Sequence, residues 1–340
     1  VVDTIYEDES AFLGTIERGL SKFNKLVDKA GKGGVLAGHA VFDLHQTDGF
    51  VLDLTTALAE DRSLTIDMKG YRIAEEEHRQ KSGIGSWGVM AAGPLDAIRQ
   101  ASGDTEFLAY DATEADAIVI GIVFDGTAVD SVKDGDSLID VVLDRSPFYG
   151  ESGGQVGDTG WLSGDGADFE VMDTQKHGGL IVHRGKLNAG ILKIGQAVQA
   201  EVVKPRRAGI QRAHSATHLL HHALHTVLGD HAVQRGSKVE DDILRFDFSH
   251  GVSVTPEELQ RVEDIINDRI VEGADVDINF MSKEEAQSGG AMALFGEKYP
   301  DRVRVVTMGD YSKELCGGIH LDNVGQVGLC RIVSEENVAA

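Results

Sequence analysis

The sequence predicts an α+β protein of several domains: a helical segment, a small antiparallel β-barrel, and then an α/β domain. Three observations lead to this prediction. Apolar residues near the N-terminus recur at three- and four-residue steps, as in an amphipathic helix. The middle of the chain contains short β-type runs separated by Gly/Asp turns. Helix and strand patterns then alternate again. The expected boundaries are 1–103, 104–205 and 206–340.

Composition narrows the class of protein. The 340 residues are enough to bury two or three separate cores, and 41% hydrophobic with 26% charged residues is ordinary for a soluble globular protein. No apolar run approaches the roughly 20 residues that span a bilayer, and no signal-peptide pattern opens the chain. Two cysteines, Cys316 and Cys330, cannot make a disulfide framework, so we expect a cytoplasmic protein. Because the sequence begins at Val1 without Met, we interpret it as a fragment of something longer.

The first 80 residues predict mostly helix and contain no recognisable site. The amphipathic pattern ends at the glycines of residues 31–34. Residues 73–81 (IAEEEHRQK) indicate a charged, exposed helix. Residues 83–103 are rich in small residues and include Pro94, which favours a linker with one short helix near residues 95–100.

After residue 103 the spacing of apolar residues changes from that of helices to that of strands. Turn pairs such as Asp125-Gly126 and Asp134-Gly135 separate the β-type runs, a pattern that favours a small antiparallel barrel. The expected strands are residues 106–110, 117–124, 137–143, 169–172, 180–184 and 197–203.

A glycine-rich stretch, SPFYGESGGQVGDTG (146–160), lies inside this region. It lacks the Lys-Ser/Thr ending of a Walker loop, and no helix pattern follows it to supply a dipole, so nucleotide binding is disfavoured. We favour a turn in which glycines such as Gly153 and Gly154 permit close backbone approach to a neighbouring domain or a ligand.

The segment from Arg207 to Leu228 predicts a helix with two different faces, ended by Gly229. On a wheel of about 100° per residue, four histidines fall on one side and an apolar stripe on the other. We therefore expect the apolar side to lie in a core and the histidine side to face a cavity. The histidines are His214, His218, His221 and His225, and the stripe is Ala216, Leu219, Leu220, Ala223, Leu224 and Val227.

Further elements follow this helix. Thr255 and Pro256 open a helix as capping residue and first helical residue, and it is expected to run to about Glu272. A short helix is expected at 282–287. Strands are expected at 233–239, 243–248, 276–281 and 303–308, with 329–333 closing the sheet.

The histidine pair His214 and His218 lies one turn apart on one helix face, where two imidazoles can bind one divalent ion. Cys316 and His320, in CGGIH, would add a thiolate and a third imidazole and complete a tetrahedral zinc site. HSATH lacks the Glu of a metalloprotease HExxH, so peptide hydrolysis by that route is disfavoured. Four protein ligands are typical of a structural zinc, and we expect the ion to position groups rather than to generate the nucleophile.

Two neighbours of this site are candidates for recognition or chemistry. Thr217 precedes the second ligand, and Gln234 is a polar residue in an expected strand. A hydroxyl beside the metal suits recognition of a small hydroxylated or amino group. The alternative for Thr217 is a hydroxyl satisfied within its own helix.

Net charge of −24 at first argues against a nucleic-acid partner. The acidic excess is greatest in the middle of the chain, however, and a basic cluster precedes the histidine helix, where it could hold the end of a polyanion near the metal. A solvated linker with chance clustering is the alternative. The cluster consists of Lys204, Arg206, Arg207 and Arg212.

Several segments closely resemble the editing domain of bacterial alanyl-tRNA synthetases: RAHSATHLLHHAL, VQRGSKVEDDILRFDFSH, ALFGEKYPDRVRVV, SKELCGGIH and GQVGLCRIVSEENVAA, in this order. SPFYGESGGQVGDTG is similar to the glycine-rich motif of the β-barrel that precedes this domain in the family. Residues 1–82 resemble the tail of the family's helical tRNA-recognition region, through EDESAFLGTIERGL, AVFDLHQTDGFVLDLT and YRIAEEEHRQKS.

The resemblance implies that zinc is bound at the four ligand positions, that Thr217 discriminates a hydroxyl, and that Gln234 belongs to the editing site. The implied reaction is hydrolysis of the ester that joins serine or glycine to the terminal adenosine of alanine tRNA. A pocket built for alanine excludes neither the smaller glycine nor an added hydroxyl strongly, which is why a second site is needed. The candidate contacts to the mischarged 3′ end are Lys204, Arg206, Arg207, Arg212, Gly153 and Gly154.

Two departures from the family pattern are visible. The usual CGGTH is CGGIH here, which places apolar Ile319 between two ligands, and Val51 stands where a proline usually follows Gly49-Phe50. The family's ATP- and alanine-binding core and its oligomerisation domain would lie outside this chain, so we expect no charging of tRNA by it. The alternatives are a non-catalytic tRNA-binding module with a structural zinc, or a threonyl-type editing domain.

Overall fold

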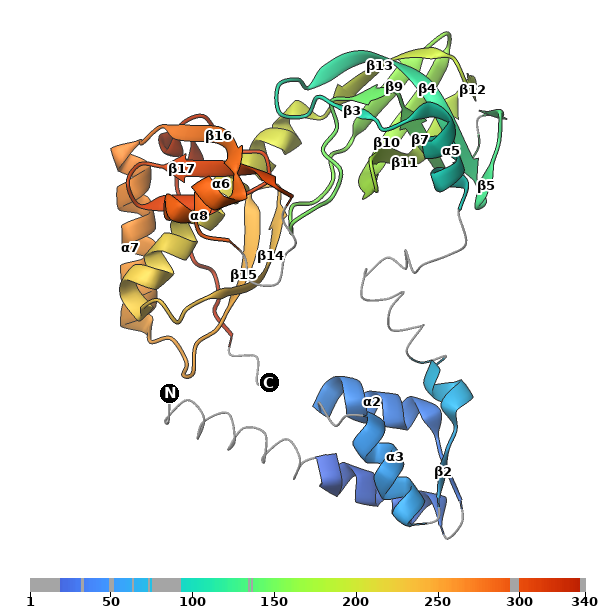
Figure 1. The fold of residues 1–340 in the computed structure, drawn as a ribbon, viewed down its shortest axis with the longest axis vertical. Coiled ribbons are helices and arrows are strands. Elements are labelled where there is room, and N and C mark those ends of the chain that lie inside the picture. The colour runs from blue at the N-terminus through green and yellow to red at the C-terminus, as the bar shows by residue number, and fades with distance from the viewer. Residues whose placement is uncertain are drawn as a thin grey trace. The chain divides into compact units, whose positions relative to one another are not determined.

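A computed structural model describes residues 19–31, 34–48, 52–62, 64–72, 74, 93–133, 135, 137–293 and 300–336. The chain divides into two compact units, Val1–Met90 with Val338–Ala340, and Ala91–Asn337 (Figure 1). No helix among the described residues is long and apolar enough to cross a membrane.

The described part of the first unit is mainly helical, as the sequence predicts. Residues 19–30 are helical, α2 spans Gly38–Asp48 and α3 spans Leu52–Asp61. Two short strands, β1 (Val35–Leu36) and β2 (Thr65–Ile66), pair in parallel, which the sequence analysis missed. Phe23, Val41 and Leu44 are among its buried core residues. Most of the helix expected at 73–81, and the first part of the N-terminal helix, lie outside the described residues.

Helix α5 (Pro94–Ser102) belongs to the second unit and packs on the barrel, where a linker was expected. Leu95 and Ile98 are buried against barrel residues such as Val142. The approach is close, because a Cβ at Gly121 would lie only 2.6 Å from Cδ1 of Ile98. The short helix expected near residues 95–100 is therefore present, but it packs on the barrel instead of lying in a free linker, because two apolar residues spaced for one helix face are buried against the sheet.

Six antiparallel strands form the closed barrel that the sequence predicts. The order is β13-β9-β10-β11-β7-β4, and β13 pairs with β4 to close the ring. The strands are β4 (Glu114–Phe124), β7 (Ile139–Leu143), β9 (Gly160–Gly164), β10 (Ala167–His177), β11 (Leu180–Ala189) and β13 (Ala197–Val202). Shorter pieces complete the region: β3 (Glu106–Phe107), β5 (Thr127–Ala128), β6 (Ser131–Lys133), β8 (Arg145–Ser146) and β12 (Ile191–Lys193).

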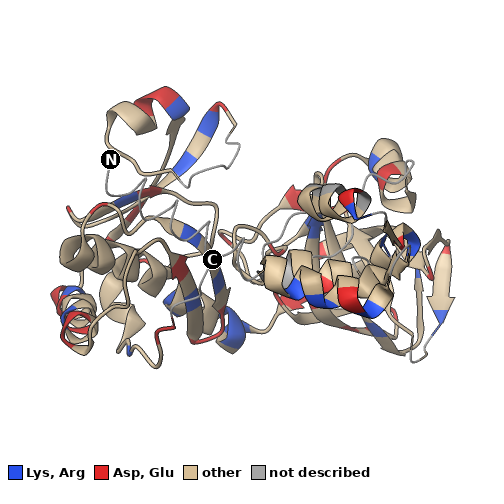
Figure 2. Ribbon diagram, turned by 90° about the horizontal axis from the view of Figure 1, so that it is seen from below, with Lys and Arg blue, Asp and Glu red and all other residues tan. Residues whose placement is uncertain are grey.

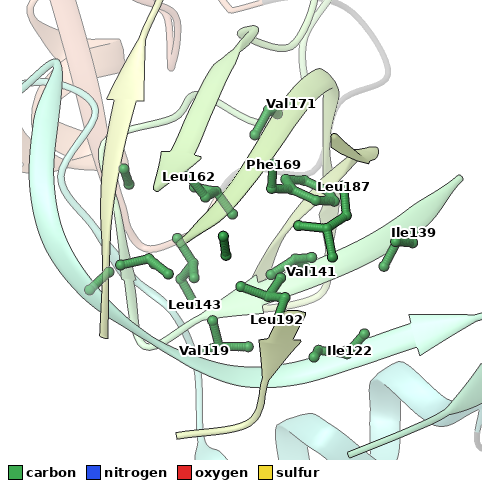
Figure 3. Packing of buried hydrophobic residues seen from close by; sticks show 14 of the residues in the cluster. Val119, Ile122, Ile139, Val141, Leu143, Leu162, Phe169, Val171, Leu187 and Leu192 are labelled. Atoms are coloured by element: carbon green, nitrogen blue, oxygen red, sulfur yellow. The ribbon is translucent and has the colours of Figure 1, made fainter. Parts of the chain in front are cut away.

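The inside of the barrel is filled by apolar side chains (Figure 3). Buried and exposed residues alternate through the first half of β10, so Phe169 and Val171 point inward while Glu170 is exposed. Phe169, Leu143 and Leu162 are fully buried. The interior is therefore a packed core, which makes the barrel a firm support for the loops that leave its strands.

The C-terminal part of this unit consists of helices and antiparallel sheets. α6 (Lys204–Leu228) follows the barrel, and β14 (Gln234–Glu240) pairs with β15 (Ile243–Phe248). A second sheet has the order β16-β17-β18, formed by Val276–Ser282, Arg302–Met308 and Ser312–Leu315. α7 (Pro256–Glu272) and α8 (Lys283–Ser288) complete it. All of these pairings are antiparallel, so the domain expected to be α/β is better described as α+β.

Two expectations about the edges of these elements were wrong. Residues 329–333 form no strand, because the place beside β17 is taken by β18, four residues further along the chain. Helix α6 begins at Lys204, so the basic cluster lies in its first turns and not in a linker before it.

The apolar side of α6 lies in the core of this domain, as predicted. Ala216, Leu219 and Leu224 contact residues of α7 and β17 there, including Ile266 and Val306. The histidine side of the helix is thereby directed toward the glycine-rich loop and the segment that follows β18.

Candidate metal centre

Four side chains from two distant segments meet at one point of the second unit. His214 and His218 come from α6, and Cys316 and His320 from the loop after β18. Their ligand atoms all lie within 4.8 Å of one another. Sγ of Cys316 is 3.4 Å from Nε2 of His214 and 3.2 Å from Nε2 of His320. A tetrahedral zinc with ordinary Zn–N and Zn–S bonds would separate its ligand atoms by about 3.3–3.6 Å, so the residues fit this ion.

His218 supplies a second test of the fit. Nε2 of His218 is buried and has no hydrogen-bond partner among the described residues. A buried polar nitrogen without a partner costs about 1–3 kcal/mol. A metal ion at the centre would take the lone pair of this nitrogen, and the cluster can therefore hold one metal ion through three imidazoles and one thiolate.

Each histidine turns its other ring nitrogen toward a polar group. Nδ1 of His214 lies 2.7 Å from Oε1 of Gln155, and Nδ1 of His218 lies 3.1 Å from Oε2 of Glu314. For His320 the neighbour is Oγ of Ser215, at 3.5 Å. For His214 the acceptor at Nδ1 keeps the proton there and leaves Nε2 free for a metal, as is usual for metal-binding histidines.

Charges around the centre favour the ligand form of the thiol. Burial raises the pKa of Cys316, but the neighbouring His214 and His320 outweigh burial and bring this pKa well below that of an ordinary thiol. Burial likewise raises the pKa of Glu314, and the adjacent His218 and His221 lower it below its usual range. The centre therefore contains a thiolate and, beside it, an ionised carboxylate.

Gln155 and Glu314 are the site residues that the sequence analysis missed. Glu314 lies in β18, two residues before Cys316, and this short strand is set by its pairing with β17, so no local pattern marked the residue. Gln155 comes from the glycine-rich loop of the barrel, is fully buried, and also lies 2.9 Å from the backbone N of Ile319. Its role depends on contacts across the fold that no local pattern reveals.

The glycine-rich loop approaches the β14–β15 hairpin closely. The backbone N of Val239 donates to O of Gly154 at 2.8 Å, and the N of Val156 donates to O of Val239 at 3.1 Å. A Cβ on Gly154 would lie 2.5 Å from the carbonyl oxygen of Ser237. Gly153 has no heavy atom within 4 Å of a built Cβ. The close approach permitted by Gly154 is thus to a neighbouring part of the protein, and an RNA contact at either glycine stays a prediction.

Thr217 and Gln234 make hydrogen bonds that do not involve the metal ligands. Oγ1 of Thr217 donates to O of Ala213, one turn earlier, at 2.9 Å, and the side chain is buried. This is the helix-satisfied hydroxyl that was the alternative for Thr217. Gln234 is half-buried on β14, and its Nε2 lies 3.2 Å from Oγ of Ser237.

Arg207 does not present its charge at the surface. Its side chain is 4% exposed and pairs with Asp158 of the glycine-rich loop, which is 1% exposed. The guanidinium also donates to the carbonyl oxygens of Ala109 and Pro147, at 2.9 and 2.7 Å. This residue ties α6 to the barrel, and no donor is directed outward for a polyanion.

The other three basic residues of the cluster are each close to an acidic side chain. Lys204 lies 3.3 Å from its partner, Arg206 3.8 Å, and Arg212 2.7 Å. Their partners are Glu114, Asp241 and Asp242. Basic and acidic residues are likewise interspersed over the described ribbon (Figure 2). The local positive potential that the sequence indicates is therefore largely cancelled.

Comparison with known families gives two matches. A family model described as tRNA synthetases class II (A) matches residues 1–206, more than half of the chain. A model described as the threonyl and alanyl tRNA synthetase second additional domain matches residues 303–340. The second match contains Cys316 and His320, two of the four candidate metal ligands.

Proposed function

The chain belongs to the tRNA synthetases class II (A), and on that premise we propose that it proofreads alanine tRNA by hydrolysing the ester of wrongly attached amino acids. The observation that carries the proposal is the cluster of His214, His218, Cys316 and His320, half of which lies in the matched second additional domain. The substrates that we propose are serine and glycine esters, because a pocket for alanine excludes neither well.

Zinc is the metal that we propose for the cluster, on the grounds of one thiolate and three imidazoles whose ligand atoms all lie within 4.8 Å of one another. When bound, zinc would orient groups near it and polarise an oxygen placed within its reach. The thiolate of Cys316 and the ionised Glu314 would together offset the charge of this ion.

Thr217 is our candidate for recognising the wrong amino acid. Because its hydroxyl hydrogen is committed to Ala213, its oxygen has only acceptor lone pairs left to offer. A serine hydroxyl or an α-ammonium group can donate to such an oxygen. Gln234 is the candidate on the neighbouring strand, where its amide oxygen remains an acceptor beyond the contact of Nε2 with Ser237.

The proposed partner is the mischarged 3′ end of alanine tRNA, encountered in the cytoplasm. Lys204, Arg206 and Arg212 remain candidates for phosphate contacts, as do Gly153 and Gly154 for the close approach of the 3′ end. The acidic partners of the three basic residues would have to be displaced or compensated. We therefore expect weak, strongly salt-dependent binding by this chain.

One observation favours a second function, a tRNA-binding module in which zinc only stabilises the fold. Four protein ligands close a tetrahedral ion and leave no position for water or substrate. In that case Thr217 and Gln234 would have no catalytic role.

The two functions are separated by incubating the zinc-containing chain with Ser-tRNA(Ala), Gly-tRNA(Ala) and Ala-tRNA(Ala). Proofreading predicts accelerated loss of serine and glycine with alanine largely spared. No acceleration of any ester, with zinc bound, would favour the binding module. Equal loss of all three would contradict proofreading, because it would show hydrolysis without discrimination.

A further inference from the structure

We propose that Gln155, on the glycine-rich loop of the barrel, is a positioning residue of the metal centre. It holds His214 in the tautomer that binds metal and fixes the Cys316–His320 loop against it. The inference rests on the metal site of the proposed function, although not on the deacylation reaction. Through Gln155 the barrel would thus contribute a residue to the metal centre, whose four ligands all lie in the following domain.

The orientation of the Gln155 amide follows from its partners. The backbone N of Ile319 can only donate, so the amide atom 2.9 Å away must be the oxygen, Oε1. The same oxygen lies 2.7 Å from Nδ1 of His214. An oxygen can only accept there, so Nδ1 of His214 carries the proton and its Nε2 carries the lone pair. That Nε2 is the atom 3.4 Å from Sγ of Cys316.

A single oxygen is thereby connected to both segments that supply ligands. His214 belongs to α6, and Ile319 immediately precedes the ligand His320. Gly318 shows how closely these groups pack: a Cβ there would collide with the ring of His214 and lie 2.9 Å from Oε1 of Gln155. The oxygen therefore sets the distance between the helix and the loop as well as the tautomer.

The backbone on both sides of Gln155 is fixed. The carbonyl of Gly154 accepts from the N of Val239, and the N of Val156 donates to the carbonyl of the same residue. Gln155 is thus held between two backbone hydrogen bonds to β14. Gly154 has a φ of 82° and no room for a side chain against Ser237, which explains the glycine before this residue.

The other half of the amide is left without a partner. Nε2 of Gln155 is buried and has no hydrogen-bond acceptor among the described residues. An apolar side chain of similar length would avoid this unfavourable burial. Packing alone therefore does not explain an amide at this position. The hydrogen bonds that its oxygen accepts do explain it. A methionine in its place removes the unpartnered Nε2 but leaves the backbone N of Ile319 and Nδ1 of His214 without their acceptor, so it should weaken the metal site.

The test measures the zinc affinity of the full chain by competition with a chelator. Gln155→Met removes the acceptor, and we expect zinc to bind about 10–100-fold more weakly. Gln155→Glu keeps an acceptor oxygen for both donors and should restore affinity close to that of the wild type. The matched control is Gln175→Met, which removes a glutamine bonded to Glu151 of the same loop but to no metal ligand. It should leave zinc affinity unchanged.

A second readout depends neither on bound zinc nor on activity. Nitrogen-15 NMR of the metal-free wild type should show His214 protonated at Nδ1, and Gln155→Met should shift it toward protonation at Nε2. Protonation at Nε2 in the metal-free wild type would overturn the inference. The inference would also be overturned if Gln155→Met bound zinc as tightly as the wild type, or if Gln175→Met lost as much zinc affinity as Gln155→Met. If the wild type bound no zinc, the metal site of the proposed function would fail, while the His214 tautomer would still decide the role of Gln155.

Discussion

Arg207 and Asp158 form a buried ion pair that fastens the histidine helix to the glycine-rich loop of the barrel. Nε of Arg207 lies 3.0 Å from Oδ1 of Asp158, and Oδ2 of the same carboxylate accepts from the backbone N of Tyr149 at 2.6 Å. With Gln155 three residues earlier, the pair fixes the geometry between the barrel and α6. The metal centre depends on this geometry because its ligand His214 on α6 is oriented by a barrel residue, Gln155.

Removing one partner of this pair should destabilise the protein strongly. Asp158→Asn leaves the Arg207 guanidinium buried without its counter-charge, and we expect a loss of about 3–5 kcal/mol in the free energy of unfolding. The matched control is Asp242→Asn, which breaks the pair of Arg212 with an exposed carboxylate and should cost about 0–1 kcal/mol. Urea titration of both variants measures the difference. Equal, small losses would show that the buried pair does not hold the two parts together.

The isoleucine of CGGIH should contribute to packing. Ile319 is 3% exposed and lies against Ala109 and Tyr149 of the barrel region. Ile319→Thr would place a hydroxyl in this apolar contact and cost about 1–3 kcal/mol of stability. The ligand side chains remain, so zinc content measured on the folded variant should stay near one ion per chain. Unchanged or increased stability would show that the position tolerates either residue.

His183 should make the stability of the barrel depend on pH. Burial lowers its pKa from 6.5 to about 4, and its ring is bonded to Ser146 and to the carbonyl of Val141. Below pH 6.5 His183 binds a proton in the unfolded chain but stays neutral in the folded one. The free energy of unfolding therefore falls as the pH drops and levels off near pH 4. The difference in pKa corresponds to about 3 kcal/mol.

The non-titrating variant His183→Gln isolates this contribution. Between pH 6.5 and pH 4 the wild type should lose more unfolding free energy than the variant, by the amount that the His183 shift provides. Denaturant titrations at a series of pH values give both curves. Parallel curves would mean that His183 takes up its proton equally in both states, contrary to its burial.

Glu314 should support the metal through His218. Glu314→Gln removes the negative charge 3.1 Å from Nδ1 of His218, and zinc should bind about 10–100-fold more weakly. Glu240→Gln, which alters an exposed pair with Lys238 on β14, is the matched control. Chelator competition gives both affinities. If the two variants bound zinc equally well, the carboxylate would have no part in holding the ligand.

Elements with strong local signals were predictable from the sequence. Thr255 and Pro256 mark the start of α7, and the structure has that helix at Pro256–Glu272 with Thr255 as its cap, as expected. The apolar stripe of α6 is equally clear. β9 was missed because GWLSG reads as the end of a glycine-rich turn, and its strand form depends on pairing with β10 and β13. The short β18 was likewise set by its pairing with β17.

The candidate site likewise contains residues that local patterns predict and residues that only long-range contacts bring to it. The four ligands were found because HxxxH and CxxxH are short patterns with a chemical meaning. Gln155 was not, because its contact with Ile319 joins residues 164 positions apart. The basic cluster was over-interpreted as a polyanion site because a sequence does not show which acidic residue lies beside each basic one. Arg207, for example, is buried against Asp158. Long-range packing decides which polar residues are available to a ligand.

The most direct test of the central claim is the rate of Ser-tRNA(Ala) hydrolysis, measured together with zinc content in two cysteine variants. Cys316→Ala removes a ligand, whereas Cys330→Ala alters a half-buried cysteine whose backbone bonds to Asn267, away from the metal ligands. We predict that Cys316→Ala loses zinc and hydrolysis together and that Cys330→Ala keeps both. Hydrolysis that persisted in a zinc-free Cys316→Ala chain, or a zinc-loaded wild type without hydrolysis, would contradict the account.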